Sequence, residues 1–482
     1  MKEELTLALN YALNKGFQIH PNAFKFLENV DVKKLERIIK EIIREKTKQK
    51  LFQINQDDIE IYLGIKDDHS LQNEHKIIFD PTLKITTGEG VNGYNALFSS
   101  RFNKLKRIIS DRPESRMIKS IASIKSIKSD SDLYVCGLVT ARIIERNVTK
   151  LILEDPSGSL DGVIFDPELQ KIAGTLLNDQ FIMARVGFGK NAGIIIKDLI
   201  LPDIPDQATN RSETETYAVF LSDLHIGSKY FMEEEFSEFI AWLSSLDPIA
   251  KKIRFVLIGG DLIDGVGIYP NQDKELVYQT IEEQLQKVEE LVNKIPNYMK
   301  IFIMPGNHDP GRRALPQPAI PKKYNFGLWE KENVFMVGNP SVISLNGVKV
   351  MMFHGQSIDD IVKTTPGLSY DKPTNVMKHL LRARHLSPIY GSQTPIAPEI
   401  EDFMVIDQIP DIFHVGHVHR AELDIYKGIL LVNSGSWQKQ TPFQASVGMT
   451  PNPGIALMVN LKTFKVYHEN YNSNKLNNIL QS

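Results

Sequence analysis

Hydrophobic residues recur at helical spacing in the first fifty residues. Between residues 32 and 43 they return every three or four positions amid Lys, Arg and Glu: Val32, Leu35, Ile38, Ile39, Ile42 and Ile43. This period predicts amphipathic helices, and we assign residues 1–55 to a helical N-terminal domain. Residues 55–93 show no sustained period, which we interpret as a linker. A further amphipathic helix follows within residues 56–115, with one apolar side formed by Leu97, Phe98, Phe102, Leu105, Ile108 and Ile109.

From about residue 131 to 202 the pattern changes to short apolar runs separated by turns. The runs are LYVCGLVT, TKLILED, LDGVIF, QFIMARVGF and GIIIKDLIL. Five short strands predict a small β-barrel over residues 116–205, for which an OB-fold is the first interpretation. Such barrels often bind single-stranded nucleic acid, but the aromatic residues that would stack on bases are sparse here. Contact with DNA and packing against a partner or another domain are therefore equal alternatives.

The polar stretch IPDQATNRSETET marks a boundary, and strands and helices alternate beyond it. Strands are expected at YAVFLSD, RFVLIGGD, KIFIMPGNHD, VKVMMFHG, DIFHVGHVH and GILLVNSGS, with helices over about 233–246 and 275–295. This alternation predicts an α/β layered domain over residues 213–482. The whole chain is therefore expected to be a multidomain α/β (α+β) protein.

Composition places the chain among ordinary globular proteins, with 482 residues, 42% hydrophobic and 24% charged. The net charge of −3 argues against binding nucleic acid through bulk charge, so DNA binding would need local basic patches or a partner's surface. The single cysteine, Cys136, excludes an internal disulfide and a cysteine-cluster zinc site, and its apolar surroundings predict burial. No run reaches the roughly 18 apolar residues of a membrane span, and the N-terminus does not resemble a signal peptide. A cytoplasmic protein without membrane contact is expected.

Five segments place Asp, Asn or His directly after an apolar strand. They are LSDLHIG (221–227), GGDLIDG (259–265), PGNHD (305–309), FHG (353–355) and GHVHR (416–420). Ligands from several strand ends can hold two divalent cations roughly 3.5–4 Å apart, which clamp a phosphodiester. Asp223 with His225, and His417 with His419, each direct two side chains to one face of an extended segment. One such segment occurs by chance, whereas five in order predict a two-metal phosphoesterase site.

These segments resemble the metal-binding motifs of the calcineurin-like metallophosphoesterases, over about residues 215–460. The resemblance implies a β-sandwich flanked by helices. It also implies a complete set of ligands: Asp223, His225, Asp261, Asn307, His354, His417 and His419. In the family pattern, one ion is bound by Asp223, His225, Asp261 and His419, and the other by Asp261, Asn307, His354 and His417. His308 is then the general acid or transition-state stabiliser, oriented by Asp309. Mixed Asp, Asn and His ligation favours Mn²⁺, with Zn²⁺ and Fe²⁺ as alternatives.

A closer resemblance links the chain to the small subunits of archaeal family-D DNA polymerases. It rests on GGDLIDGVGIYP (259–270), RHLSPIYG (384–391), the barrel directly upstream and the helical N-terminal unit, and it covers nearly the whole chain. It implies a 3′→5′ proofreading exonuclease that acts on DNA 3′ ends and assembles with a large polymerase subunit; a sliding clamp is a further candidate partner. The B-subunits of eukaryotic replicative polymerases share this layout but have lost most ligands, whereas here each ligand is present.

Basic residues near the motifs are candidates for DNA contact. Arg312 and Arg313 follow the GNHD segment, and Arg420 follows the last metal histidine. We expect these three to guide the phosphate backbone. For Lys322 and Lys323, a solvated loop surface is an equal alternative.

Five further residues have expected positions. Asp264 is expected either to contact a metal ligand or to cap a helix. His379 and His385, on a basic stretch, are expected to face solvent, DNA or a partner. His414 and Trp437 are expected in the core.

Two alternative functions are left open by the sequence. A stand-alone repair nuclease or other phosphodiesterase would act without a partner and without need of the barrel. A non-catalytic polymerase scaffold would carry a vestigial metal site, and the intact ligand set argues against it.

Overall fold

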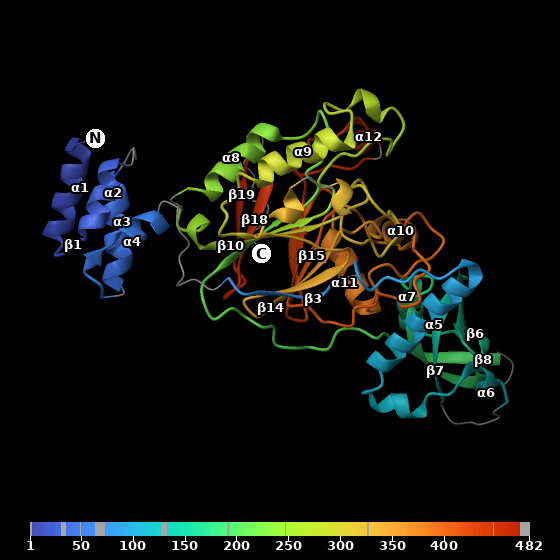
Figure 1. The fold of residues 1–482 in the computed structure, drawn as a ribbon. Coiled ribbons are helices and arrows are strands. Elements are labelled where there is room, and N and C mark those ends of the chain that lie inside the picture. The colour runs from blue at the N-terminus through green and yellow to red at the C-terminus, as the bar shows by residue number, and fades with distance from the viewer. Residues whose placement is uncertain are drawn as a thin grey trace.

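The computed structural model describes residues 2–29, 35–48, 50–62, 73–126, 133–189, 193–245, 247–324, 327–446 and 448–472. Figure 1 shows a helical unit at the N-terminus, a small barrel, and a large central domain of sheets and helices. No helix within these ranges is both long and apolar enough to cross a membrane.

The N-terminal unit is a helical bundle, as the periodic pattern predicts. Its elements are α1 (Lys2–Asn14), β1 (Gln18–Ile19), α2 (Pro21–Asn29), α3 (Leu35–Lys48), β2 (Gln53–Ile54) and α4 (Gln56–Tyr62). The predicted stripe of α3 is buried from Leu35 to Ile43, while Val32 lies outside the described residues. The bundle extends past the expected limit at residue 55 because α4 buries Ile59 in the same core. It lies to one side of the other parts in Figure 1.

The interpretation of residues 55–93 as a linker was wrong, because the described part of this range contains α4, β3 (His75–Phe79) and the start of a further helix. β3 pairs antiparallel with β13 (Ser341–Leu345) at the edge of a sheet in the central domain. A short edge strand with few buried side chains does not produce the sustained alternation that sequence analysis detects. α5 (Gly90–Ile108) matches the predicted amphipathic helix and buries Leu97, Phe102 and Leu105. It is followed by α6 (Ile121–Ser126).

Five strands close into a barrel in the order β4-β5-β6-β8-β7, as the short apolar runs predict. They are β4 (Leu133–Ile144), β5 (Thr149–Asp155), β6 (Gly158–Ile164), β7 (Phe181–Gly189) and β8 (Gly193–Ile200), with α7 (Pro167–Gly174) before β7. The interior is aliphatic, with Val135, Leu151, Leu160 and Ile182 fully buried. Cys136 is buried, as expected.

The central domain contains two six-stranded sheets, ordered β12-β11-β10-β9-β18-β19 and β16-β17-β15-β14-β13-β3. The strands of the first sheet are β9 (Tyr217–Leu221), β10 (Ile253–Gly259), β11 (Lys300–Met304), β12 (Val334–Met336), β18 (Ile455–Asn460) and β19 (Val466–Asn470). Those of the second, besides β3 and β13, are β14 (Val348–Phe353), β15 (Ile412–Val415), β16 (Ala421–Tyr426) and β17 (Ile429–Ser434). The helices are α8 (Glu233–Leu243), α9 (Ile281–Val292), α10 (Ile358–Thr364), α11 (Pro373–Ala383) and α12 (Pro442–Ser446).

Neighbouring side chains on each strand enter different cores, which produces four layers. In β9, Phe220 belongs to the core between the two sheets, whereas Leu221 packs with residues of α8 and α9. In β14, Met352 faces the first sheet, whereas Phe353 packs with residues of α10 and α11. The domain is therefore a sandwich of two sheets with helices on both outer faces (Figure 1), as the α/β pattern predicts.

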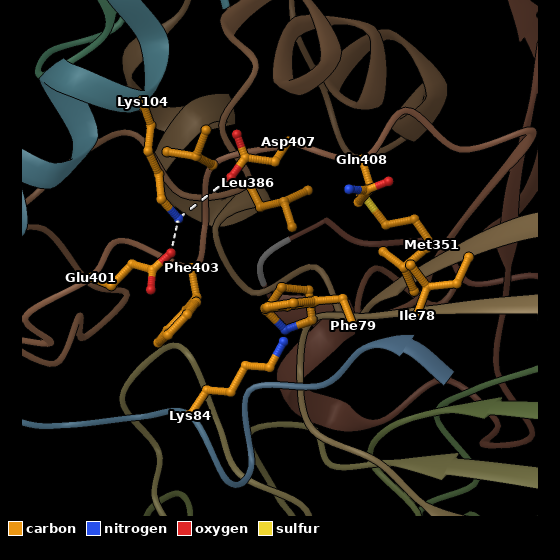
Figure 2. A pocket seen from close by; sticks show the side chains of 13 residues that line it. Ile78, Phe79, Lys84, Lys104, Met351, Leu386, Glu401, Phe403, Asp407 and Gln408 are labelled. Atoms are coloured by element: carbon orange, nitrogen blue, oxygen red, sulfur yellow. Dashed lines mark ion pairs between the residues drawn. The ribbon is translucent and has the colours of Figure 1, made fainter. Parts of the chain in front are cut away.

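A cavity of about 220 Å³ lies where β3 and α5 meet the central domain. Figure 2 shows Lys104 of α5 reaching across this junction to Glu401 at 2.6 Å and Asp407 at 3.4 Å. The ring of Phe403 lies below the same ammonium group, 5.4 Å from its centroid to Nζ. The lining residues of the cavity, all within the described ranges, include none of the predicted metal ligands.

A buried polar cluster fastens α5 to the central domain. Nε of Arg101 donates to Oδ2 of Asp402 at 2.8 Å, and Nε2 of His385 lies 3.0 Å from the same oxygen. Because Arg384 adopts a left-handed conformation (φ 53°) at the end of α11, His385 turns inward and is 1% exposed. The expectation that His385 faces solvent, DNA or a partner was therefore wrong.

The structure also gives the burial of the remaining residues with an expected position, His379, His414 and Trp437. His379 of α11 is partly buried. His414 and Trp437 are fully buried, as expected for core residues, and Nε2 of His414 lies 3.0 Å from Oγ of Ser434.

Candidate metal centre

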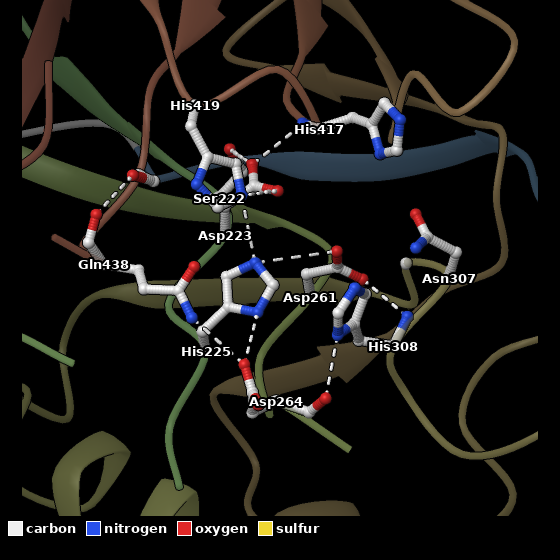
Figure 3. Close-up of polar contacts among 12 residues, drawn as sticks. Ser222, Asp223, His225, Asp261, Asp264, Asn307, His308, His417, His419 and Gln438 are labelled. Atoms are coloured by element: carbon white, nitrogen blue, oxygen red, sulfur yellow. Dashed lines mark hydrogen bonds and ion pairs between the residues drawn. The ribbon is translucent and has the colours of Figure 1, made fainter. Parts of the chain in front are cut away.

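The five polar segments meet at one edge of the sandwich because the strands before them run parallel within each sheet. β9, β10 and β11 are mutually parallel, and so are β14 and β15, so their carboxyl ends lie together. Figure 3 shows the side chains from these strand ends pointing toward one another. All seven predicted ligands lie in this group: Asp223, His225, Asp261, Asn307, His354, His417 and His419.

Asp223, His225 and His419 form a first cluster, in which one possible ligand atom of each lies within 4.8 Å of the others. Nε2 of His225 lies 3.0 Å from Nε2 of His419, and Oδ1 of Asp223 lies 3.5 Å from the same nitrogen of His419. Three buried groups that can each offer a lone pair thus face one small volume.

Asp261, His354 and His417 form a second cluster by the same criterion. Nε2 of His354 lies 3.3 Å from Oδ2 of Asp261 and 3.0 Å from Oδ1 of Asn307. Asn307 is partly exposed and therefore closes the cluster on the open side.

Asp261 lies between the two clusters. Its Oδ2 is 3.3 Å from His354 of the second cluster and 3.8 Å from His225 of the first. Its Oδ1 accepts a hydrogen bond from the backbone N–H of His308 at 2.8 Å, which fixes the carboxylate plane. This position is the one that a carboxylate shared by two cations must occupy.

The backbone is strained at the ligands themselves. Asp223, His225, Asp261, His417 and His419 all have left-handed φ angles, between 51° and 70°. Residues other than glycine adopt this backbone conformation rarely, at a cost of order 1–3 kcal/mol each, and such strain is concentrated at functional sites. The fold therefore holds five of the seven predicted ligands in a conformation that their local sequence does not favour.

Glycines allow the strand ends to approach one another. A side chain at Gly306 would come within 2.2 Å of Oδ1 of Asp261, and one at Gly416 within 2.6 Å of Oδ2 of Asp223. The turns that carry Asn307 and His417 therefore depend on the absence of a side chain at the preceding position.

In His225, His354 and His419, three of the predicted ligands, the second ring nitrogen also has a polar partner. Nδ1 of His225 lies 3.1 Å from the carboxylate of Asp264, and Nδ1 of His354 lies 2.9 Å from the carbonyl oxygen of Gly259. Both acceptors lack a hydrogen, so each Nδ1 must carry the proton and Nε2 is left as the ligand atom. The amide of Gln444 lies 2.9 Å from Nδ1 of His419.

Of these three supporting groups, only Asp264 is suggested by its sequence position. Its side chain contacts the predicted ligand His225, and the alternative role in helix capping is not the one observed. Gln444 follows His419 by 25 positions and carries no sequence signal of this contact.

The buried carboxylates and histidines of the centre shift one another's pKa. Burial would raise the pKa of Asp261, but the imidazoles of His354 and His308 hold it well below its usual range. Burial would lower the pKa of His354, but the carboxylates of Asp261 and Asp223 raise it to about 10. The carboxylates thus create a negative potential that protonated histidine balances here, and bound cations would compete with those protons.

The residues present fit divalent cations. Oδ1 of Asp223 is buried and accepts no hydrogen bond from the described residues, although its partner oxygen accepts from Ser222 and from the backbone N–H of His417. A buried carboxylate oxygen without a donor is costly unless a cation or water satisfies it. Oxygen and imidazole donors together suit Mn²⁺, Fe²⁺ or Zn²⁺.

Comparison with known proteins identifies the family of this chain. The sequence profile of the alpha/epsilon B-subunit family of DNA polymerases matches residues 218–422, which span all seven predicted ligands. The chain is 38% identical over 385 residues to the DNA polymerase II small subunit of Archaeoglobus fulgidus, which covers 79% of this chain and 77% of that protein. It is 34% identical over 423 residues to the DNA polymerase II small subunit of Pyrococcus furiosus, covering 84% and 68%.

The chain belongs to the family of archaeal DNA polymerase II small subunits. The family resemblance predicted from GGDLIDGVGIYP and RHLSPIYG is thereby confirmed. Among solved structures, an archaeal phosphodiesterase aligns with 53% of this chain and 99% of its own, at 11% identity and a TM-score of 0.28.

In this polymerase small subunit, His308 and Asp309 have different surroundings. Nδ1 of His308 lies 2.8 Å from the carbonyl oxygen of Asp264 and must donate to it, so Nε2 is the atom left for chemistry. Burial lowers the pKa of His308, while the nearby carboxylate of Asp261 opposes that shift.

The expectation that Asp309 orients His308 was wrong. The carboxylate of Asp309 accepts hydrogen bonds from three backbone N–H groups, those of Leu262 (3.0 Å), Ile263 (3.2 Å) and Gly306 (2.8 Å). Burial and repulsion from Asp261 raise its pKa to about 7. Asp309 therefore joins the loops that carry Asp261 and Asn307, and it acts on the backbone instead of on the histidine ring.

The three arginines predicted to bind DNA differ in their contacts and exposure. The guanidinium of Arg312 pairs with buried Glu399 at 2.5 Å and donates to the carbonyl oxygen of Pro316, which corrects the expected contact with DNA to an internal ion pair. Arg313 is exposed. Arg420 is half-buried and donates to the carbonyl oxygen of Thr450 at 3.0 Å.

Proposed function

We propose that this polymerase small subunit is a metal-dependent 3′→5′ exonuclease that hydrolyses phosphodiester bonds at DNA 3′ ends and proofreads for a replicative polymerase. The observation that carries the proposal is the convergence of all seven predicted ligand side chains at one edge of the sandwich, on strained backbone. A relic without catalytic use would have no reason to retain both the donor set and the strain.

The chemistry needs each group in a defined role. Two divalent cations, Mn²⁺ by preference, would supply charge neutralisation at the phosphate and activation of water. Asp261 faces both clusters and sets their separation. Water adds to phosphorus and releases a proton, and the bond from phosphorus to the 3′-oxygen breaks. That oxygen takes a proton from Nε2 of His308, which must enter the step as the imidazolium because its Nδ1 also donates, to the carbonyl oxygen of Asp264. The proton released by the water restores the imidazolium. The products are a 5′-nucleoside monophosphate and a DNA strand shortened by one nucleotide with a free 3′-hydroxyl.

Membership of a family of small subunits supports a large catalytic subunit as partner, with a sliding clamp as a further candidate. We assign the barrel to the OB-fold class, with residues 1–55, 116–205 and 213–482 as the helical, barrel and phosphoesterase domains. The exposed Arg313 and the half-buried Arg420 are proposed to contact the DNA backbone. DNA is the proposed substrate because of the family, and phosphodiester hydrolysis because of the site.

The test is digestion of DNA with labelled 5′ ends and either a paired or a mismatched 3′ nucleotide, with Mn²⁺, Zn²⁺ or Fe²⁺, with and without the large subunit. We expect stepwise shortening by the wild type and none by Asp261→Asn. Asp424→Asn is the matched control, because it removes a solvent-accessible carboxylate that pairs with Lys378 on α11, away from the ligands. Full activity without the large subunit would favour a stand-alone nuclease. Absence of shortening under every condition would leave a scaffold.

A further inference from the structure

α10 begins four residues after His354, and its first turn carries two adjacent carboxylates in different surroundings. Asp360 is 1% exposed and accepts hydrogen bonds from Oγ of Ser392 (2.7 Å) and from the backbone N–H groups of Gln393 (2.9 Å) and Thr394 (3.0 Å). Ile358 and Ile361, on either side of the pair, are fully buried in the core. The helix is therefore fixed in rotation, with Asp360 directed into the protein.

Asp359 consequently faces the metal centre. Its Oδ2 lies 3.1 Å from Nε2 of His417, and its side chain is 32% exposed. The hydroxyl of Tyr370 is a second hydrogen-bond partner of the same carboxylate. Because the carboxylate can only accept, Nε2 of His417 must carry a hydrogen, and Nδ1 is left as the nitrogen that can face Asp261 and His354.

His417 needs such a contact more than the other ligand histidines do. The side-chain exposure is 0% for His354, 3% for His225 and 7% for His419, but 14% for His417. Surrounding atoms hold the first three rings in place, whereas the ring of His417 borders solvent. The hydrogen bond to Asp359 opposes a flip of this ring, which would exchange its two nitrogens.

We propose that Asp359 is a positioning residue that holds the ring of His417 with Nδ1 toward Asp261 and His354, and so sets the affinity of the cation at that cluster. The inference rests on the proposed metal site but not on the proposed DNA substrate. The buried hydrogen bonds of Asp360 fix α10 so that the carboxylate of Asp359 contacts the predicted ligand His417. Groups that orient metal-bound histidines typically change metal affinity about 10–100-fold when removed.

The experiment is Mn²⁺ binding to the full chain by calorimetry, with ion positions located by anomalous diffraction from Mn²⁺-soaked crystals. We expect two ions in the wild type and in the Asp424→Asn control. Asp359→Ala should weaken one ion by about 10–100-fold, with loss of the peak beside His417, while the peak beside His225 remains. Asp359→Asn should lie between, because its amide oxygen still accepts from the ring but carries no charge.

A merely structural role for Asp359 predicts that Asp359→Ala lowers the melting temperature of the metal-free protein. A positioning role predicts that this temperature stays nearly constant. The melting temperature of the metal-free protein should change by less than about 2 °C in Asp359→Ala, because the carboxylate is one-third exposed. Wild-type affinity for both ions in Asp359→Ala, or equal loss of both, would overturn the inference. Absence of Mn²⁺ binding in the wild type would overturn the proposed function together with it.

Discussion

Replacement of Asp309 by Ala separates the role predicted from sequence from the one found in the structure. If Asp309 oriented His308, the variant would lose activity and keep its stability. In the structure the carboxylate instead accepts from the backbone N–H groups of Leu262, Ile263 and Gly306, and alanine leaves all three buried donors without an acceptor. The main loss should therefore be in the stability of the two ligand-bearing loops.

The size of the effect follows from the three hydrogen bonds. Removing the acceptor of a buried N–H donor costs about 1–3 kcal/mol, and water entering the vacated space returns part of it. A net loss of about 3 kcal/mol or more is expected, which corresponds to roughly a hundredfold increase in local opening, at 1.36 kcal/mol per tenfold change. The measurement is made at pH 6, below the pKa of about 7 to which burial and Asp261 raise this carboxyl, so that alanine does not also relieve a buried negative charge.

The assay is amide hydrogen exchange of the metal-free protein, read in peptides that cover 259–265 and 304–309. Asp411→Ala is the matched control, because Asp411 is also buried and accepts from the backbone N–H groups of Asn210 (2.7 Å) and Lys349 (2.8 Å), at the opposite end of β15 from the ligands. Only Asp309→Ala should accelerate exchange in the ligand loops and weaken Mn²⁺ binding. Exchange within threefold of wild type, together with lost nuclease activity, would refute the structural role.

Three further predictions use the same structure. His308→Asn should retain two Mn²⁺ ions while kcat for nucleotide release falls about 10²–10⁴-fold, the range of general acid catalysis; loss of an ion on calorimetry would contradict this. Arg313→Ala should weaken DNA binding and reduce its salt dependence by about one phosphate contact, whereas Arg312→Ala should lower the melting temperature and leave that slope unchanged in a fluorescence titration. Burial lowers the pKa of His385 to about 4. Between about pH 6.5 and 4 this histidine is therefore protonated in the unfolded chain but neutral in the folded protein, so the free energy of unfolding falls as the pH falls through that window. Thermal melts should show a smaller drop from pH 6.5 to 4.5 in His385→Gln, and an unchanged drop would contradict the assignment.

The ligand positions were accessible from the sequence because each is tied to a local pattern. An apolar strand followed by Asp, Asn or His at its end predicts both the strand and the location of the side chain, and parallel strands then bring those ends together. The barrel strands, the helix of residues 90–108 and the buried positions of Cys136, His414 and Trp437 follow from equally local signals. β3 did not, because its pairing with β13 depends on a segment more than 260 positions away.

The sequence by itself determined which residue types could bind cations and which strands would carry them. Only the tertiary structure decided how those residues are used, because hydrogen bonds across the chain are independent of sequence spacing. Asp309 is adjacent to His308 but acts on backbone at 262, 263 and 306, and Arg312 is taken up by Glu399 instead of facing outward. Asp359 and Gln444 contact ligand histidines 58 and 25 positions away, respectively. The residue types at the strand ends identify the predicted ligands, and the three-dimensional packing sets the orientation of their side chains.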